Sequence, residues 1–109
     1  MNIFHKDLVG RWNQFSIFEQ MANIGAEVGR AINWRNKKNN EMSKNAFYRA
    51  LELIDFTVDD NKNINSLKEI LIMRELLVDY LMGDNIYHST DKSWEKYFYP
   101  FNFAARKSH

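Results

Sequence analysis

Arg74 has the most unusual setting of any chemically active side chain in this sequence. It lies in the stretch Ile64–Met82, whose apolar spacing predicts a single helix. One face of that helix carries, around Arg74, the residues Leu67, Ile70, Leu71, Leu77, Val78 and Leu81. A guanidinium in that position must pair with a carboxylate, extend past the apolar stripe to solvent, or bind an anion.

Carboxylates on two other predicted helices could pair with Arg74. The candidates are Glu27 on one helix and Glu52 or Asp55 on the next. Leaving a buried arginine without its partner typically costs roughly 3–5 kcal/mol, so a pair or network is favoured. We therefore expect Arg74 to be buried and bonded to one of these acids. Binding of an anion by Arg74 is the alternative.

A second group combines an aromatic ring with clustered charges near the end of the first helix. It consists of Glu27, Arg30, Trp34, Arg35, Lys37 and Lys38. With Arg74, the pair Arg30 and Trp34 could stack a base and hold phosphate, which makes a nucleotide or another small anion a candidate ligand. The same cations would also offset the dipole of a solvated helix end. With 15 basic and 14 acidic side chains, the net charge is only +1, so nucleic acid is not an expected partner.

Metal and catalytic patterns are weak. Oxygen-bearing side chains cluster at one predicted turn: Asp79, Asp84, Asn85, Tyr87 and His88. Their spacing does not match an EF-hand, and Asx turns and helix caps explain them more simply. The three histidines are scattered, at His5, His88 and His109, and cysteine is absent. We therefore expect no metal and no cofactor, and we rank enzymatic activity below a binding role.

Helical periodicity dominates the elements that would position these residues. It predicts four main helices: about Gln14–Asn36, Asn40–Thr57, Ser66–Met82, and one from Ser89 or Thr90 to Arg106. Short polar connections favour an up-and-down antiparallel bundle, in one domain spanning residues 1–109. Ser66 and Glu69 have capping-box spacing, with Ile64 as a staple residue. Pro100 predicts a kink or a break in the last helix.

Two glycines on the first helix, Gly25 and Gly29, stand one turn apart. Each lowers helix stability by roughly 1 kcal/mol relative to alanine. A close approach by another backbone or by a ligand would compensate for that loss. We therefore expect a close helix–helix crossing at this pair.

Large apolar residues of the last two helices exceed what one bundle face can cover. The expected interface residues are Ile72, Leu76, Tyr80, Trp94, Tyr97, Phe98 and Phe101. Because small monomers rarely expose such patches, we expect a homodimer that docks a larger partner as well. The alternative is that an N-terminal arm covers these residues within one chain, through Ile3, Phe4, Leu8 and Trp12.

The longest apolar runs, Ile70–Met73 and Leu76–Val78, are too short to span a bilayer, and the first residues lack the features of a secretory signal. We expect a cytoplasmic protein.

Several segments carry a resemblance to known proteins. The segments that carry it most clearly are Ala22–Trp34, Ala46–Asp55, Asp79–Tyr87 and Lys96–Arg106, and the resemblance extends over most of the chain. In these segments the chain resembles a family of small, uncharacterised prokaryotic all-helical proteins. The resemblance implies a helical fold and a complete protein. It implies no activity, because none is assigned to that family.

Overall fold

The structure is a computed structural model that describes residues 10–107. It contains two short 3-10 helices, η2 (Trp12–Gln14) and η3 (Asn61–Ser66). Its four α-helices are α1 (Ile17–Asn36), α2 (Asn40–Asp59), α3 (Leu67–Leu81) and α4 (Asp91–Lys107). The described residues form no strand, and the prediction of an all-α bundle with four main helices is confirmed.

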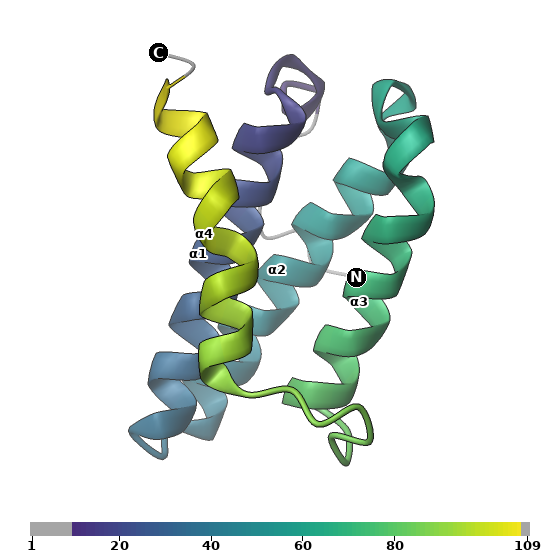
Figure 1. The fold of residues 1–109 in the computed structure, drawn as a ribbon. Helices are drawn as coiled ribbons and strands as arrows, with labels where there is room; N and C mark the ends of the chain where they lie inside the picture. Colours follow the sequence, from purple (N-terminus) through teal and green to yellow (C-terminus); the bar gives the residue numbers. More distant parts are fainter. Residues whose placement is uncertain (1–9, 108–109) are drawn as a thin grey trace.

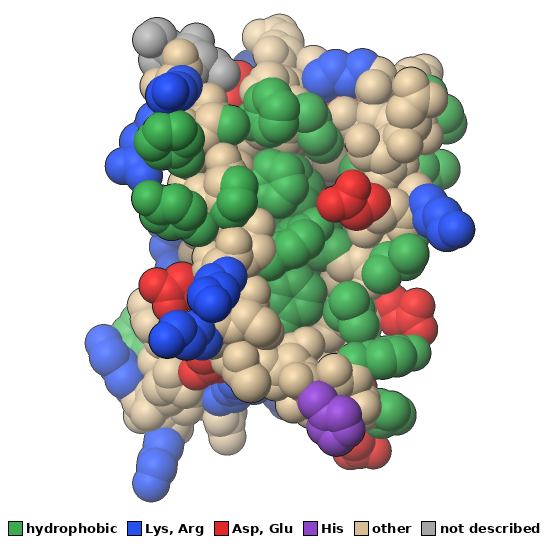
Figure 2. All heavy atoms as spheres, in the orientation of Figure 1, with side chains coloured by type: hydrophobic (Ala, Val, Ile, Leu, Met, Phe, Trp, Pro, Cys, Tyr) green, Lys and Arg blue, Asp and Glu red, His purple; other side chains and the backbone are tan. Residues whose placement is uncertain are grey.

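Successive helices run in opposite directions, as the colour gradient in Figure 1 shows. α1 packs against both α2 and α4, whereas α3 packs mainly against α2. Direct contact between α3 and α4 is sparse. The bundle therefore has α1 and α2 at its centre. The space-filling view shows a surface furrow between α3 and α4 (Figure 2).

Local caps fix where the helices begin. Ser16 and Glu19 form a capping box on α1: the Glu19 amide donates to Ser16 Oγ at 3.1 Å, and the Ser16 amide donates to Glu19 Oε1 at 3.0 Å. Asn39 caps α2, because its Oδ1 accepts from the Met42 amide. Thr90 and Ser93 make reciprocal bonds at the start of α4.

The capping box expected at Ser66 is wrong. Ser66 makes no side-chain cap bond, because the chain before it is already helical in η3. Asp60 caps that 3-10 helix instead, accepting from the Lys62 amide at 3.2 Å. Ile64 is 66% exposed and does not act as a staple.

A Schellman motif ends α1 without a glycine. Lys38 adopts a left-handed conformation with φ of 63°. The Asn39 amide donates to the Trp34 carbonyl, and the Lys38 amide donates to the Arg35 carbonyl, both at 2.9 Å. These two bonds reverse the chain, so that α2 returns antiparallel to α1.

Pro100 does not break the last helix, because α4 is continuous from Asp91 to Lys107. A proline inside a helix removes one hydrogen bond, here the one to the Lys96 carbonyl. Pro100 lies on the exposed side of α4, where water can satisfy that carbonyl. The break that the sequence allowed is therefore absent.

The core is formed mainly by α1 and α2, with Ile70, Met73 and Leu77 from α3 and two aromatic side chains from α4. The most deeply buried apolar residues are Ile24, Val28, Ala31, Ala46, Phe47, Ala50, Ile54 and Leu77. Trp94 and Phe98 of α4 are 5% and 4% exposed. Since α1 is covered on two sides, its sequence has to satisfy two helix neighbours at once.

The two glycines of α1 have different environments. A Cβ added to Gly25 would lie 2.7 Å from Cγ of Phe98, far inside van der Waals contact. A Cβ added to Gly29 would meet nothing within 4 Å. The close crossing predicted for both glycines therefore exists at Gly25, where the ring of Phe98 rests on α1, and not at Gly29.

Alanine substitution should separate these two roles. We expect Gly25→Ala to lower the free energy of unfolding by about 1–3 kcal/mol, because the new methyl group collides with Phe98. Gly29→Ala, the matched control, should raise it by up to about 1 kcal/mol through helix propensity. Urea titration of both variants measures the effects, and stabilisation by both would show that α4 does not dock as described.

Candidate functional site

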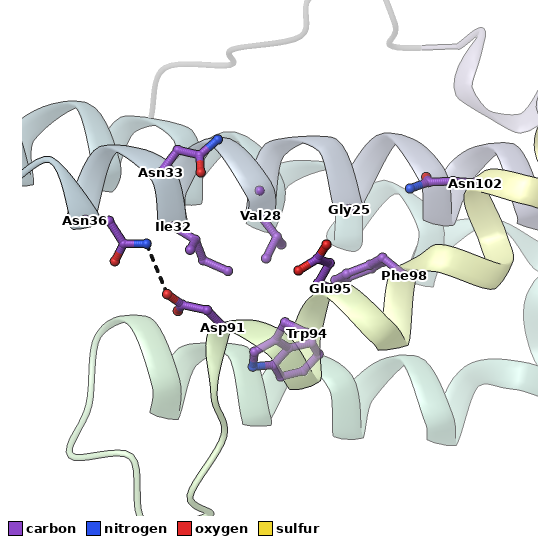
Figure 3. Close-up of a pocket in the computed structure, with 11 residues that line it drawn as sticks. Gly25, Val28, Ile32, Asn33, Asn36, Asp91, Trp94, Glu95, Phe98 and Asn102 are labelled. Carbon is purple, nitrogen blue, oxygen red and sulfur yellow. Dashed lines mark hydrogen bonds between the residues drawn. The ribbon is translucent and has the colours of Figure 1, made fainter.

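A groove lies between α1 and α4 and has a volume of about 420 Å³. Gly25, Val28, Gly29 and Ile32 line it from α1, while Trp94 and Phe98 line it from α4 (Figure 3). Polar side chains surround this apolar floor: Asn33, Asn36, Asp91, Glu95 and Asn102. The open space beside Gly29 is part of this α1–α4 groove.

Asp91 ties one end of the groove to the rest of the bundle. Its Oδ1 accepts from Arg35 Nη2 at 2.9 Å and from the Tyr80 hydroxyl, and its Oδ2 accepts from Asn36 Nδ2 at 3.1 Å. The guanidinium of Arg35 also lies 4.4 Å from the centre of the Tyr80 ring. This cluster joins the end of α1, the end of α3 and the start of α4.

Burial and hydrogen bonding shift the pKa values within this cluster. Burial alone would raise the pKa of Asp91, but hydrogen bonds from Tyr80 and Asn36 and the charge of Arg35 lower it below 3.8. Burial and the bond to Asp91 raise the pKa of Tyr80. The cluster is therefore an ionised carboxylate held by three donors, an arrangement that fixes helix ends.

The groove is better suited to a ligand that carries hydrogen-bond donors than to an anion. Its lining includes the carboxylates of Asp91 and Glu95 and three asparagine amides, but no lysine or arginine. An anionic ligand would meet negative charge there. The groove is consequently a poor phosphate site.

Arg74 is bonded to Asp55, one of the three acids expected from the sequence, but the expectation that it is buried is wrong. Its side chain is 37% exposed, and its Nε donates to Asp55 Oδ1 at 3.1 Å, on a carboxylate that is 57% exposed. The buried stripe of α3 is narrow and consists of Ile70, Met73 and Leu77. Because α3 packs mainly against α2, Arg74 falls at the edge of that stripe.

The remaining members of the predicted polar network lie elsewhere. Glu27, 13% exposed, pairs with Arg30 at 3.0 Å and with Arg49 of α2 at 3.1 Å. Lys37 lies over the ring of Trp34, 5.4 Å from its centre. Glu52 is partly buried on α2. Arg30 and Arg74 thus bind different carboxylates, and the structure does not join them into one site.

The buried polar network that does exist was missed by sequence reasoning. Gln20, fully buried, donates to the Trp12 carbonyl at 3.0 Å and to Asp60 Oδ2 at 2.9 Å, and accepts from Asn63 at 2.8 Å. Trp12 Nε1 donates to Thr57 Oγ1 at 3.0 Å. A glutamine on the apolar face of α1, beside Met21 and Ile24, was the available signal.

Asp60 supplies the charge of that network. It accepts from Gln20 and the Lys62 amide and forms an ion pair with the Lys62 ammonium. Burial would raise the pKa of Asp60, but the bonds from Lys62 and Gln20 outweigh burial and lower it below 3.8. The network joins η2, α1, α2 and η3 at one end of the bundle.

The expected interface residues divide into buried and exposed ones. Trp94 and Phe98 are core residues of the single chain, so an exposed role for them is wrong. Leu76, Tyr80, Tyr97 and Phe101 are partly buried and pack against the core. Ile72 is 46% exposed. Figure 2 shows hydrophobic side chains continuing along the surface between α4 and α3.

The alternative cover for these residues was the N-terminal arm. Ile3, Phe4 and Leu8 lie outside the described residues. Trp12 is 2% exposed, with its ring centre 5.5 Å from that of Phe15 and 6.4 Å from that of Phe56. Trp12 therefore packs near the start of α1 and the end of α2.

The acidic turn after α3 is explained by backbone bonds. Asp79 accepts from the amides of Ile86 and Tyr87, at 2.8 and 3.1 Å, and Asn85 accepts from the Ser89 amide. Within residues 10–107, no three His, Asp or Glu side chains are grouped so as to hold a metal ion. No helix of the described part is long and apolar enough to cross a membrane.

Comparison with known proteins adds no relative. No protein-family model, no curated protein and no solved structure matches this chain.

Replacing Arg74 by alanine tests its assigned position. We expect the free energy of unfolding to change by less than about 1 kcal/mol, because exposed ion pairs contribute little. Arg49→Ala is the comparison. It should lower the free energy of unfolding more than Arg74→Ala does, because Arg49 pairs with the more buried Glu27. A loss of several kcal/mol for Arg74→Ala in thermal unfolding would contradict this assignment.

Asp60 should make stability sensitive to acid. Because the folded-state pKa of Asp60 is lowered, its contribution is present above about pH 4 and disappears as the pH falls through that folded-state value. We expect Asp60→Asn to cost about 1–3 kcal/mol at pH 7 and progressively less at lower pH. Urea titrations from pH 7 to pH 2.5 measure this, with the exposed Asp59→Asn as control. An Asp60→Asn deficit that stays constant with pH would contradict it.

Proposed function

We propose that this chain is a non-enzymatic interaction module that forms a homodimer in the cytoplasm and also docks a larger protein. The proposal places the dimer contact on the exposed side of α3 and on the adjoining furrow between α3 and α4. We also propose that the chain is related to the small prokaryotic all-helical proteins that its sequence resembles.

The concentration of exposed apolar side chains on and around α3 carries the proposal. Among the described residues, the large exposed hydrophobics between positions 64 and 87 are Ile64, Leu71, Ile72, Met82, Ile86 and Tyr87. Their exposed fractions range from 46% to 70%. The rest of the described chain spreads five such residues over α1, α2 and α4. A patch of this kind on a small domain favours burial against another protein surface.

The partly buried residues of the furrow extend the same surface. Leu76 on α3 and Tyr97 and Phe101 on α4 pack against the core from opposite sides of the furrow. Burial and the charge of Glu69 raise the pKa of Tyr97 to about 12, so its hydroxyl stays neutral. The furrow is therefore lined mainly by apolar and aromatic side chains, with Glu69 as a charged neighbour of Tyr97, which suits an aromatic-rich interface.

Binding of a nucleotide or another small anion is the second candidate. It would use Arg30, Trp34 and Arg74, as the sequence suggested. Arg30 and Arg74 are each neutralised by a carboxylate, and Lys37 lies over Trp34. An anion would have to displace those partners on two different parts of the surface, so we rank this function below dimerisation. A thermal shift with ATP or inorganic phosphate would reverse the ranking.

Introducing a charge at Ile72 tests the dimer. We expect the wild-type chain to dimerise with increasing concentration, and Ile72→Glu to weaken the dimer at least about tenfold, because each copy would bury a carboxylate. Phe18→Glu is the matched control, since Phe18 is 45% exposed on α1. Sedimentation equilibrium measures both. A wild-type mass that stays monomeric up to millimolar concentration would overturn the proposal.

A further inference from the structure

The outer face of α3 has a self-complementary order of residues. Lys68, Leu71, Ile72 and Glu75 follow the spacing i, i+3, i+4, i+7 and therefore share one side of the helix. All four are exposed, on the side opposite the buried Ile70, Met73 and Leu77. Two aliphatic residues thus form the middle of a stripe that has a cation at one end and an anion at the other. We call these four residues the α3 stripe.

The chain after α3 folds back beside the anionic end of this stripe. Asp79 holds the amides of Ile86 and Tyr87, and the Tyr87 hydroxyl reaches Glu75 Oε1 at 3.4 Å. Ile86 and Tyr87 are 70% and 55% exposed. The loop therefore places two exposed apolar side chains next to Glu75. The cationic end has its own exposed apolar residue, Ile64, one turn before Lys68.

We propose that two copies of this chain pair through antiparallel α3 helices, with the two-fold axis between Leu71 and Ile72. This inference rests on the proposed homodimer and adds its geometry. In an antiparallel pair, a residue that lies a given number of positions before this axis faces the residue of the second copy that lies equally far after it. Leu71 then meets Ile72 of the second copy, and Lys68 lies level with Glu75 of the second copy.

Charge complementarity indicates that the α3 stripe is covered by a second copy of this chain. The two-fold axis generates the Lys68–Glu75 contact twice, once at each end of the apolar centre. A parallel pairing would instead set Lys68 against Lys68 and Glu75 against Glu75, which like-charge repulsion disfavours. A two-fold contact is also the commonest symmetry of homodimers.

The loop residues complete the contact area. A stable interface buries roughly 800 Å² on each partner, which a single helix face rarely supplies. In the antiparallel arrangement, Ile64 of one copy lies level with Asp79 of the other, and Asp79 holds the Ile86–Tyr87 loop. Ile64 therefore packs against that loop, and the most exposed apolar side chains around α3 become buried together.

Charge reversal at the two ends of the stripe tests this geometry. We expect Lys68→Glu and Glu75→Lys each to weaken the homodimer at least about fivefold, because each variant sets like charges opposite one another twice. The double variant K68E/E75K should recover wild-type dimerisation. An equimolar mixture of the two single variants, one with a mass tag, should form mainly heterodimers in native mass spectrometry.

The outcomes separate the geometry from the dimer itself. Circular dichroism melting of each variant establishes that it is folded, since exposed charge changes should leave the monomer stable. If the wild-type chain dimerises but neither single variant weakens the dimer, the antiparallel α3 pairing is overturned and the dimer is not. The same holds if the double variant fails to restore dimerisation. A wild-type chain that never dimerises would overturn both.

Discussion

The contact between Phe98 and Gly25 is the constraint on which the arrangement of this bundle depends. Any residue other than glycine at position 25 would place its Cβ 2.7 Å from Cγ of Phe98. That close approach lets α4 lie directly on α1, which is then covered on two sides. α4 packs on α1 and makes little contact with α3. The α1–α4 groove beside Gly29 and the furrow between α3 and α4 both accompany this packing of α4 on α1.

Two polar clusters hold the opposite ends of α1. At its start, Gln20 joins Trp12, Asp60 and Asn63 in a buried network. At its end, Asp91 accepts hydrogen bonds from Arg35, Asn36 and Tyr80. Packing α4 also has a cost, because Trp94 Nε1 and the Tyr97 hydroxyl are buried without a hydrogen-bond partner in the described structure. Aromatic packing among Trp94, Tyr97, Phe98 and Phe101 offsets part of that loss.

The one-sided packing of α3 links the architecture to the proposed function. A helix with one main neighbour buries only a narrow stripe, so Leu71 and Ile72 stay exposed although the helix is rich in apolar residues. The apolar stripe between Lys68 and Glu75, on a chain with a net charge of only +1, is the feature from which we propose self-association. The α1–α4 groove, with its carboxylates and amides, lies away from that stripe and has a different chemistry.

The sequence by itself determined the parts that depend on neighbouring residues along the chain. Four helices and their approximate ends follow from periodicity and caps, which act over one or two helical turns. Even there, two local features were missed. Ser16 and Glu19 have the same capping-box spacing as Ser66 and Glu69, and theirs is the capping box that forms. The left-handed Lys38 had no such signal, because no glycine marks the end of α1. Only the tertiary structure decided which side of each helix meets a neighbour. Periodicity put Arg74 at the centre of an apolar face, but α2 covers α3 along Ile70, Met73 and Leu77, so Arg74 remained at the edge. It also decided that Gln20 is buried among three hydrogen-bonding partners, Trp12, Asp60 and Asn63. It decided as well that Phe98 packs on Gly25, while Gly29 faces open space. These outcomes depend on where a second helix lies, and a single helix face carries no information about that position.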